Sequence, residues 1–176
     1  TSDVFRNLLG SNFSSNTISN TFQNNVFQSN TSGNAFGVFQ NNSCGRDFNT
    51  NTFTASFNNN NVFGDDFRSN SVTGGSFFNN RFDHICVSNT FNNAVFRDNS
   101  FGVGFSTNSF SVGQFYGISA GNNFANNQIT LLMIYTSFGN DCNNNQFLGQ
   151  VAGNKFGDYC QQNVCRATSN LQQNDI

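Results

Sequence analysis

Apolar residues, most of them Phe, recur along nearly the whole sequence at alternating steps of four and five residues. Near the C-terminal end, for example, Phe138, Phe147 and Phe156 lie nine residues apart. A register kept over this length indicates packing against fixed neighbours, because a prion-like disordered chain needs aromatic residues but no fixed spacing. With single-residue shifts at three places, the register passes through Phe13, Ile18, Phe22, Phe27, Thr31, Phe36, Cys44, Phe48, Phe53, Phe57, Phe63, Phe67, Val72, Phe77, Phe82, Cys86, Phe91, Phe96, Phe101, Phe105, Phe110, Phe115, Ser119, Phe124, Ile129, Met133 and Phe138.

An Asn often precedes the apolar residue by two positions, as at Asn20, Asn25, Asn51 and Asn89. Residues two apart in an extended strand point to the same face, so the Asn and the Phe of each NxF triplet are both expected to point inward. A buried amide is costly unless it is hydrogen-bonded. In a stack of strands, each amide can bond to the backbone or to the next amide along.

A strand of three residues is too short to be stable alone, and the Asn, Gly and Ser that follow it favour turns. A chain that repeats a short strand and a turn winds into a coil, whose strands pair with those of the coils on either side. The sequence therefore predicts an all-β fold, a β-solenoid (parallel β-helix) of short strands with a stacked Phe core and Asn ladders. Four units per coil give about 18 residues per coil. Three units per coil, or a rod intertwined from three chains, are the alternatives, and we expect right-handed winding by analogy with crossover connections.

Composition limits the class of partner. The chain has 176 residues, among them 36 Asn and 24 Phe, and a net charge of −2. So little charge offers neither a basic surface for phosphates nor a dense acidic one, so we expect no nucleic-acid partner and disfavour a DNA mimic of pentapeptide type. No run of 18 apolar residues exists, so we expect no membrane partner.

The length of the chain suits one domain, which we expect to span residues 1–176. The first residue is Thr1, with no initiator Met and no basic-then-apolar signal segment. We therefore interpret the chain as a fragment or processed product of a longer protein.

The four-sided coil resembles the pentapeptide-repeat proteins, in which an inward Leu or Phe recurs every five residues, although here the step alternates. The segments "TSFGNDCNN" (136–144) and "NKFGDYCQQ" (154–162) resemble more closely the Asn/Phe nonapeptide arrays of NTFGNxCxS type. This resemblance covers most of the chain. It implies a scaffold like the tail-fibre-like surface proteins of gut bacteriophages and their hosts, and it brings no catalytic residues and no cofactor.

The expected function is therefore a structural or adhesive rod without enzymatic activity, located outside the cell or on a virion. Its expected partners are further copies of the chain, neighbouring fibre or virion proteins, and surface glycans. The alternative is a polysaccharide-degrading spike, which a resemblance to β-helical phage depolymerases implies. Such a spike would use an Asp pair, for which the adjacent Asp65 and Asp66, with Asp47 and Asp83 on neighbouring coils, are the candidates. Ice binding is disfavoured because Thr does not recur at the repeat period.

The five Cys residues all occupy apolar slots of the register, and we interpret them as small buried hydrophobic residues. No CxxC pair exists, so no metal site is predicted, and the odd number argues against a disulfide framework. The single His, His84, lies two residues before an apolar slot and is interpreted as a buried substitute for the Asn of the triplet. The Cys residues are Cys44, Cys86, Cys142, Cys160 and Cys165.

Candidate binding residues are aromatic or apolar side chains outside the inward register. Exposed aromatics among amides can form a platform for glycans, and the candidates are Phe39, Phe78, Tyr116, Tyr135 and Tyr159. The segment "ITLLMIY" (129–135) places apolar residues on both sides of the wall, which is expected only where something covers the outside. The predicted interface with a neighbouring chain consists of Leu131, Leu132, Ile134 and Tyr135.

Overall fold

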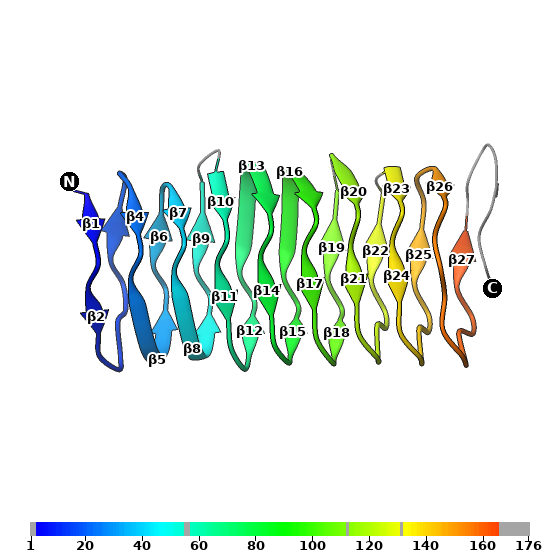
Figure 1. Cartoon of the computed structure of the whole chain (residues 1–176), viewed down its shortest axis with the longest axis horizontal. Coiled ribbons are helices and arrows are strands. Elements are labelled where there is room, and N and C mark those ends of the chain that lie inside the picture. Colours follow the sequence, from blue (N-terminus) through cyan, green and yellow to red (C-terminus); the bar gives the residue numbers. More distant parts are fainter. Residues whose placement is uncertain (1–2, 55–56, 112, 131, 166–176) are drawn as a thin grey trace.

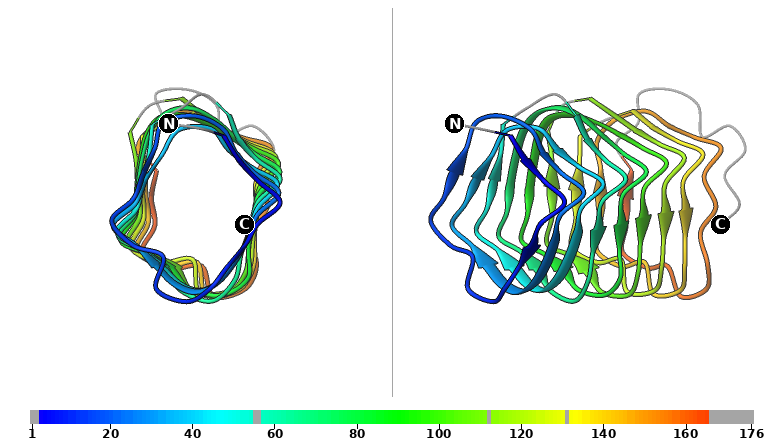
Figure 2. Two further views of the ribbon diagram at one scale, coloured as in Figure 1. Left: turned by 90° about the vertical axis from the view of Figure 1, so that its left-hand side faces the viewer. Right: turned by 60° about the vertical axis from the view of Figure 1, so that its left-hand side comes forward.

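The computed structural model describes residues 3–54, 57–111, 113–130 and 132–165 of the chain. Within these residues the chain winds into a rod of stacked coils built from short parallel strands (Figure 1). One coil takes 17, 18 or 19 residues, which is the separation of the Asn residues that bond between successive coils. Viewed along the axis, the coils follow one closed outline (Figure 2). The predicted β-solenoid is confirmed as a rod wound from one chain, while its handedness stays a prediction.

The described residues form 27 strands in two sheets. Most strands have only two residues, because the chain turns a corner directly after them. The 16-stranded sheet contains β1 (Val4–Phe5), β3 (Thr17–Ile18), β4 (Phe22–Gln23), β6 (Ala35–Phe36), β7 (Phe39–Gln40), β9 (Thr52–Phe53), β10 (Phe57–Asn59), β13 (Ser71–Phe78), β16 (Thr90–Arg97), β19 (Ser109–Phe110), β20 (Gln114–Tyr116), β22 (Gln128–Ile129), β23 (Leu132–Ile134), β25 (Gln146–Phe147), β26 (Val151–Ala152) and β27 (Val164–Cys165). The 11-stranded sheet contains β2 (Leu8–Leu9), β5 (Val26–Ser32), β8 (Ser43–Asn49), β11 (Val62–Phe63), β12 (Phe67–Arg68), β14 (Arg81–Phe82), β15 (Cys86–Val87), β17 (Ser100–Phe101), β18 (Phe105–Ser106), β21 (Ser119–Ala120) and β24 (Ser137–Phe138).

The backbone register aligns four columns of residues along the rod, which we call A to D in the order in which the chain visits them. Column A is Val4, Phe22, Phe39, Asn58, Phe77, Phe96, Phe115, Met133 and Val151. Column B is Leu9, Phe27, Cys44, Phe63, Phe82, Phe101, Ala120, Phe138 and Phe156. Column C is Phe13, Thr31, Phe48, Phe67, Cys86, Phe105, Phe124, Cys142 and Cys160. Column D is Ile18, Phe36, Phe53, Val72, Phe91, Phe110, Ile129, Phe147 and Cys165.

The Phe rings of the four columns form one continuous core. Phe91 is 1% exposed, and its ring lies edge-to-face with Phe96 of the same strand, β16, at a centroid distance of 4.6 Å. Rings of successive coils also stack, as between Phe105 and Phe124, whose centroids are 5.0 Å apart. Each buried Phe removes roughly 150–250 Å² from water, so the stack supplies the apolar burial that two-residue strands cannot provide.

Two ladders of mostly Asn side chains run along the rod, two residues before columns B and D. Along most of each ladder, Oδ1 accepts a hydrogen bond from the backbone N–H of the ladder residue one coil earlier, and Nδ2 donates to a carbonyl oxygen of that earlier coil. An amide can satisfy both groups because its oxygen accepts hydrogen bonds and its NH₂ group donates them. The ladder before column B is Asn7, Asn25, Asn42, Asn61, Asn80, Asn99, Ile118, Thr136 and Asn154. The ladder before column D is Asn16, Asn34, Asn51, Asn70, Asn89, Asn108, Asn127, Asn145 and Asn163.

The NxF prediction holds for columns B and D but is wrong where the chain takes a four-residue step. Asn25, Asn51 and Asn89 are buried as predicted, whereas Asn20 is exposed. The five-residue steps from A to B and from C to D leave the residue two before the column inside the coil, while a four-residue step places it on the outer corner. The buried role predicted for His84 is wrong for the same reason, since its side chain is 63% exposed.

The exposed corners of the coil also select particular residue types, because most corners contain a residue with a positive φ. Examples are Asp66 (φ 66°), Asn79 (φ 53°) and Ser88 (φ 58°). Asn and Asp adopt this left-handed conformation more readily than other residues with a side chain. The abundance of Asn therefore has two causes, ladder positions inside and corner positions outside.

The register shifts are concentrated in one connection of the coil. The chain advances five residues from A to B, four from B to C and five from C to D, whereas three to five residues separate column D from the next column A. Two predictions are corrected at this variable corner. Phe39 is a member of column A and is fully buried, and Asn58, not Phe57, is aligned with it. Outside this corner, Ala120 is the buried residue where the register predicted Ser119.

The prediction that the cysteines are buried is confirmed for three of them. Cys44, Cys86 and Cys142 are buried, but Cys160 is half-exposed, and all four are free thiols. Cys165 lies in β27, and its side chain is outside the described part of the structure. Burial raises the pKa of Cys44 well above its ordinary value, and burial also raises that of Cys86, against a smaller opposing effect of its hydrogen bond from Asn89.

Candidate functional site

Tyr116 and Tyr135 lie next to each other on the outside of the rod, on successive coils. Tyr116 ends β20 and Tyr135 directly follows β23, and these two strands are paired. Their ring centroids are 5.6 Å apart and the ring planes are inclined at 86°, which is an edge-to-face contact. The residues are 38% and 63% exposed, so the tyrosine pair presents an aromatic surface to solvent.

Tyr135 occupies a backbone position that bulky residues rarely adopt. Its φ is 51°, in the left-handed region, where a large side chain is an outlier. Gly153, at the corresponding corner of the next coil, provides the space for the ring. A Cβ at Gly153 would lie 2.8 Å from two ring carbons of Tyr135. The corresponding corners of the other coils carry Arg6, Asn24, Asn41, Asn60, Asn79, Asp98, Gly117 and Gly153.

Apolar residues flank the tyrosine pair on the same wall, and we call them the wall strip. Backbone pairing places Ile134 beside Tyr116, and Leu132 beside Gln114. All members of the strip are half-buried, so each remains partly open to solvent. Ser76, Phe78, Val95 and Arg97 line a shallow groove at one end of the strip. The wall strip consists of Phe78, Val95, Leu132 and Ile134.

The structure separates the residues that were predicted as binding aromatics. Phe39 is wrong as a candidate because its ring is in the core, out of reach of any ligand. Phe78 is in the groove of the wall strip, and Tyr159 is 71% exposed at the corner between columns B and C. Leu131, predicted as an interface residue, lies outside the described residues.

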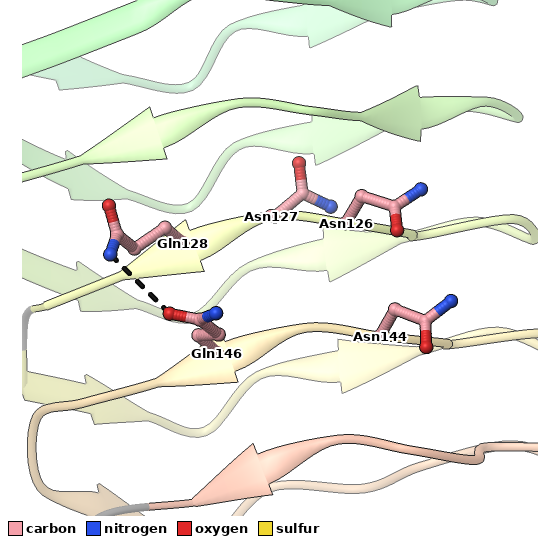
Figure 3. A pocket seen from close by; sticks show the side chains of 5 residues that line it. All are labelled: Asn126, Asn127, Gln128, Asn144 and Gln146. Atoms are coloured by element: carbon pink, nitrogen blue, oxygen red, sulfur yellow. Dashed lines mark hydrogen bonds between the residues drawn. The ribbon is translucent and has the colours of Figure 1, made fainter.

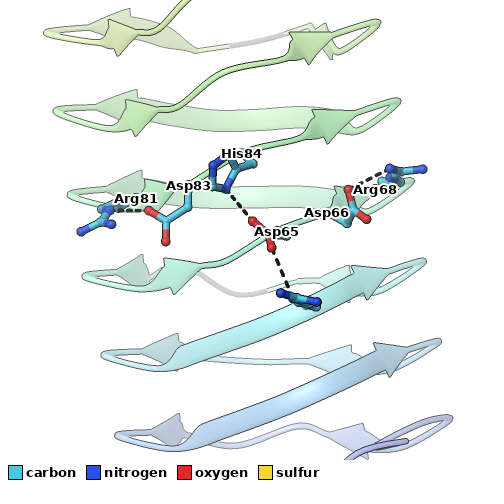
Figure 4. Close-up of polar contacts among 7 residues, drawn as sticks. Asp65, Asp66, Arg68, Arg81, Asp83 and His84 are labelled. Atoms are coloured by element: carbon cyan, nitrogen blue, oxygen red, sulfur yellow. Dashed lines mark hydrogen bonds and ion pairs between the residues drawn. The ribbon is translucent and has the colours of Figure 1, made fainter.

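The acids predicted as a catalytic pair lie at the corner between columns B and C. Asp65 Oδ1 lies 2.5 Å from His84 Nδ1 of the next coil (Figure 4). Asp65 also forms an ion pair with Arg46 of the previous coil (3.4 Å). Asp66 is paired with Arg68 at 2.7 Å instead. A shallow depression at this corner is lined by Asp65, Asp66, His84, Ile85, Val103 and Gly104.

Asp47 and Asp83 lie on the coils before and after this pair, as predicted. The backbone N–H of Asp47 donates to the carbonyl oxygen of Asp65, and Asp83 forms an ion pair with Arg81 (2.5 Å). A general acid active near neutral pH requires a carboxyl group in an apolar, desolvated site. The side chains of Asp65 and Asp66 are 42% and 27% exposed and each faces a cation. Through its contacts with Arg46 and His84, Asp65 links three successive coils.

A depression lined by amides lies at the corner between columns C and D and was not predicted from the sequence. Its lining comes from two successive coils, and Gln128 Nε2 is 3.5 Å from Gln146 Oε1 (Figure 3). Amide donors and acceptors side by side suit the hydroxyl groups of a sugar. The signal that could have revealed it is the repetition of Asn and Gln one coil apart. The lining residues are Asn126, Asn127, Gln128, Asn144 and Gln146.

Comparisons with protein-family models, with curated proteins and with solved structures find no match to this chain. Among the described residues, no cluster of three or more His, Cys, Asp or Glu side chains could hold a metal ion. No helix in the same part of the chain is long and apolar enough to cross a membrane.

Proposed function

We propose that the protein is a structural and adhesive rod without enzymatic activity, part of a phage tail fibre or a cell-surface fibre that acts outside the cell or on the virion. The supporting features are the continuous Phe core and the Asn ladders, which bond every coil to its neighbours. A shaft of this kind resists bending because each coil is tied to the next by backbone and side-chain hydrogen bonds together.

The tyrosine pair is the observation that carries the adhesive part of the proposal. Tyrosine offers a large, amphipathic contact surface at low cost in side-chain entropy, which suits stacking against the apolar face of a sugar ring. Tyr135 is held at a positive φ, over a glycine that leaves room for its ring. The same corner of the other coils has a positive φ too, but carries Arg, Asn, Asp or Gly, so the fold itself does not require a bulky aromatic residue there.

The test is binding to a panel of surface polysaccharides, measured by titration calorimetry. Tyr135→Ala should weaken binding about three- to tenfold, because it removes one stacking ring worth about 0.7–1.4 kcal/mol. Tyr159→Ala is the matched control, since Tyr159 is also exposed and has a φ of 59° but lies at another corner. Equal loss in the two variants, or no binding by the unmodified protein to any glycan, would contradict the adhesive proposal.

The polysaccharide-degrading alternative rests on the depression at Asp65 and Asp66. A different measurement distinguishes it from the non-enzymatic rod. A rod that only binds should release no reducing sugar from the glycans that it retains. If the protein releases saccharide and Asp66→Asn abolishes this release, the protein is an enzyme and the proposal of a non-enzymatic rod is wrong.

The wall strip supports lateral assembly as a further part of the proposal. Leu132 and Ile134 face outward from β23 and are only half-covered by their own chain. We expect them to pack against a neighbouring copy or another fibre protein. Replacing both with Ser should leave the rod folded and reduce the cross-section of the particle measured by X-ray scattering. An unchanged cross-section in the double variant would place any lateral contact elsewhere.

A further inference from the structure

One row of outward side chains follows the rod axis beside column A. Strands β13, β16, β20 and β23 lie side by side along the rod (Figure 1), and their register places Phe78 beside Arg97 and Arg97 beside Tyr116. The next coil carries Tyr135, whose ring contacts that of Tyr116. We call Phe78, Arg97, Tyr116 and Tyr135 the axial row. It presents aromatic rings on three of four successive coils and a guanidinium group on the fourth.

The axial row is accessible from solvent along its whole length. Phe78 and Arg97 line the shallow groove at one end, and the tyrosine pair is exposed at the other. Successive coils are about 4.8 Å apart, so the row extends over about 14 Å from the coil of Phe78 to that of Tyr135. The coil spacing is close to the length of one sugar unit in an extended chain. A linear polysaccharide that follows the row would therefore place about one sugar unit on each coil.

Arg97 forms an ion pair with the residue that follows it. Its Nε lies 3.1 Å from Oδ2 of Asp98, and the two side chains are 58% and 47% exposed. Among the described residues, no other hydrogen bond or ion pair engages this guanidinium group, so its terminal NH₂ groups can donate to a ligand. The carboxylate of Asp98 supplies acceptors. The pair therefore offers donors and acceptors side by side without a net charge.

Glycine allows the carboxylate of Asp98 to lie next to the tyrosine pair. Asp98 and Gly117 occupy the same corner on successive coils, and a Cβ at Gly117 would collide with Oδ1 of Asp98. Gly117 directly follows Tyr116 in the chain. It leaves room for the carboxylate as Gly153 does for the ring of Tyr135. The ion pair and the two rings therefore form one continuous surface.

This surface has the groups that recognise an uncharged sugar. An aromatic ring packs against the apolar C–H face of a sugar ring, and each sugar hydroxyl both donates and accepts hydrogen bonds. Adjacent hydroxyls therefore match the acceptors of Asp98 and the donors of Arg97. A carboxylate or sulfate group on the sugar would meet a guanidinium that Asp98 already neutralises, and the carboxylate of Asp98 would repel it. No charge is added by the outward residues on the other side of column A, which are Ser76, Val95, Gln114 and Leu132.

We propose that the axial row binds an uncharged linear polysaccharide, which lies along the rod axis. Its sugar rings stack on Phe78, Tyr116 and Tyr135, and its hydroxyl groups bond to Arg97 and Asp98. This inference rests on the adhesive part of the proposed function, and it adds the chemical class of the glycan and the direction in which the glycan lies. It does not depend on lateral assembly through the wall strip.

The experiment compares matched probes by titration calorimetry with the unmodified chain. The neutral probes are linear disaccharides and hexasaccharides of glucose, mannose and galactose. The acidic probes are the same oligosaccharides of glucuronate, mannuronate and galacturonate, which differ only by a carboxylate at C6. We expect at least one neutral hexasaccharide to bind at least about tenfold more tightly than its acidic counterpart. It should also bind more tightly than the disaccharide of the same sugar, because it covers more of the row.

Phe78→Ala tests the direction of the ligand. The hexasaccharide should bind about three- to tenfold more weakly, because one stacking ring is lost. The disaccharide should change by less than about twofold, since it occupies the tyrosine pair and does not reach Phe78 three coils away. Val87→Ala, at another half-buried apolar position on a different wall, is the control and should leave both affinities unchanged.

Asp98→Asn tests the charge of the site, and its expected effect includes a gain. The substitution keeps the corner conformation, because Asn also adopts a φ of 54° readily. It leaves Arg97 without its counter-charge, so the acidic hexasaccharide should bind at least about threefold more tightly than it binds to the unmodified chain. The neutral hexasaccharide should bind more weakly, whereas a purely structural role of Asp98 would weaken both. Asp141→Asn, at another corner with a φ of 61°, is the control and should change neither.

Binding of acidic oligosaccharides in preference to every neutral one would overturn the inference and leave the adhesive rod intact. A chain that retains a polysaccharide but binds none of the neutral oligosaccharides would do the same. Equal effects of Phe78→Ala on the two lengths would show that the ligand does not follow the rod axis. An unchanged affinity of the Asp98→Asn variant for the acidic hexasaccharide would contradict the charge preference assigned to the ion pair. If no glycan binds at all, the proposed function itself is wrong.

Discussion

The backbone N–H of Asn70 donates to Oδ1 of Asn89, one coil further along the chain, at a distance of 2.8 Å. Asn89 Nδ2 in turn donates to the carbonyl oxygen of Phe67 (3.0 Å). Both backbone groups lie in or next to a corner, where strand pairing has ended. The amide therefore satisfies buried backbone groups that no neighbouring strand can reach, and this is the physical reason for the ladder.

The first prediction compares the same substitution at a ladder position and at a corner position. Asn89→Gly should lower the free energy of unfolding by about 2–5 kcal/mol, because it leaves the N–H of Asn70 and the carbonyl oxygen of Phe67 buried without partners. Asn79→Gly should change it by less than about 0.5 kcal/mol, since Asn79 is exposed and its φ of 53° suits glycine. Urea denaturation measures both, and similar losses in the two variants would contradict the assignment of two roles for Asn.

The second prediction concerns the ring stack. Phe91→Ala should cost about 3–5 kcal/mol, because it opens a cavity between the rings of Phe77, Phe96 and Phe110. Thr90→Ala, at the preceding and exposed position of β16, should cost less than about 1 kcal/mol. A small loss at Phe91, equal to that at Thr90, would mean that the column is loosely packed.

The third prediction is a substitution that stabilises the protein. Thr31 is 1% exposed in column C, and its Oγ1 has no hydrogen-bond partner. Thr31→Val keeps the shape and removes the unpaired hydroxyl, so the free energy of unfolding should rise by about 1 kcal/mol. Thr17→Val, at an exposed position of β3, is the control and should change stability by less than about 0.5 kcal/mol. A destabilised Thr31→Val variant would show that the hydroxyl has a partner in solution.

The fourth prediction is a loss of stability at alkaline pH. Burial raises the pKa of the Cys44 and Cys86 thiols in the folded state, whereas in the unfolded chain a thiol ionises near pH 8.5. The unfolded state therefore loses protons first, so the stabilisation is complete below about pH 8.5 and decreases as the pH rises toward the folded-state pKa.

The measurement for this prediction is denaturation at neutral and at alkaline pH, for the unmodified chain and for a variant with both thiols replaced by Ala. The double variant should start from a lower stability, because it loses buried volume, but should decline less between the two pH values. Parallel declines in the two proteins would assign the effect to groups other than Cys44 and Cys86.

The slots of the core could be read from the sequence wherever the step between them is constant. Phe48, Phe53 and Phe67, for instance, are buried as the alternating register predicts. The Asn of the triplet was placed correctly at Asn51 and Asn89 for the same local reason, because residues two apart share a face of a strand. Asn20 was placed wrongly, because a four-residue step turns that position outward. The sequence shows the length of each step, but not the side of the wall to which a corner turns the side chain.

The candidate site was only partly predictable. The sequence indicated that Tyr116 and Tyr135 lie outside the core, but it did not indicate that their rings meet. Phe39 was grouped with them, although its ring is in column A. The amide-lined depression was missed because it forms only when residues of successive coils lie side by side.

The sequence by itself determined the coil, the apolar slots and the residue type of the ladders, because these depend on neighbours a few residues apart. Only the tertiary structure decided which residue of one coil lies above which residue of the next. That alignment depends on how many residues the variable corner contains, and this number differs between coils. The coil between Asp65 and His84 has 19 residues, which brings these two side chains together. The coil after Tyr116 has 18 residues, so Tyr116 is aligned with Ile134 and its ring meets Tyr135, one residue further on.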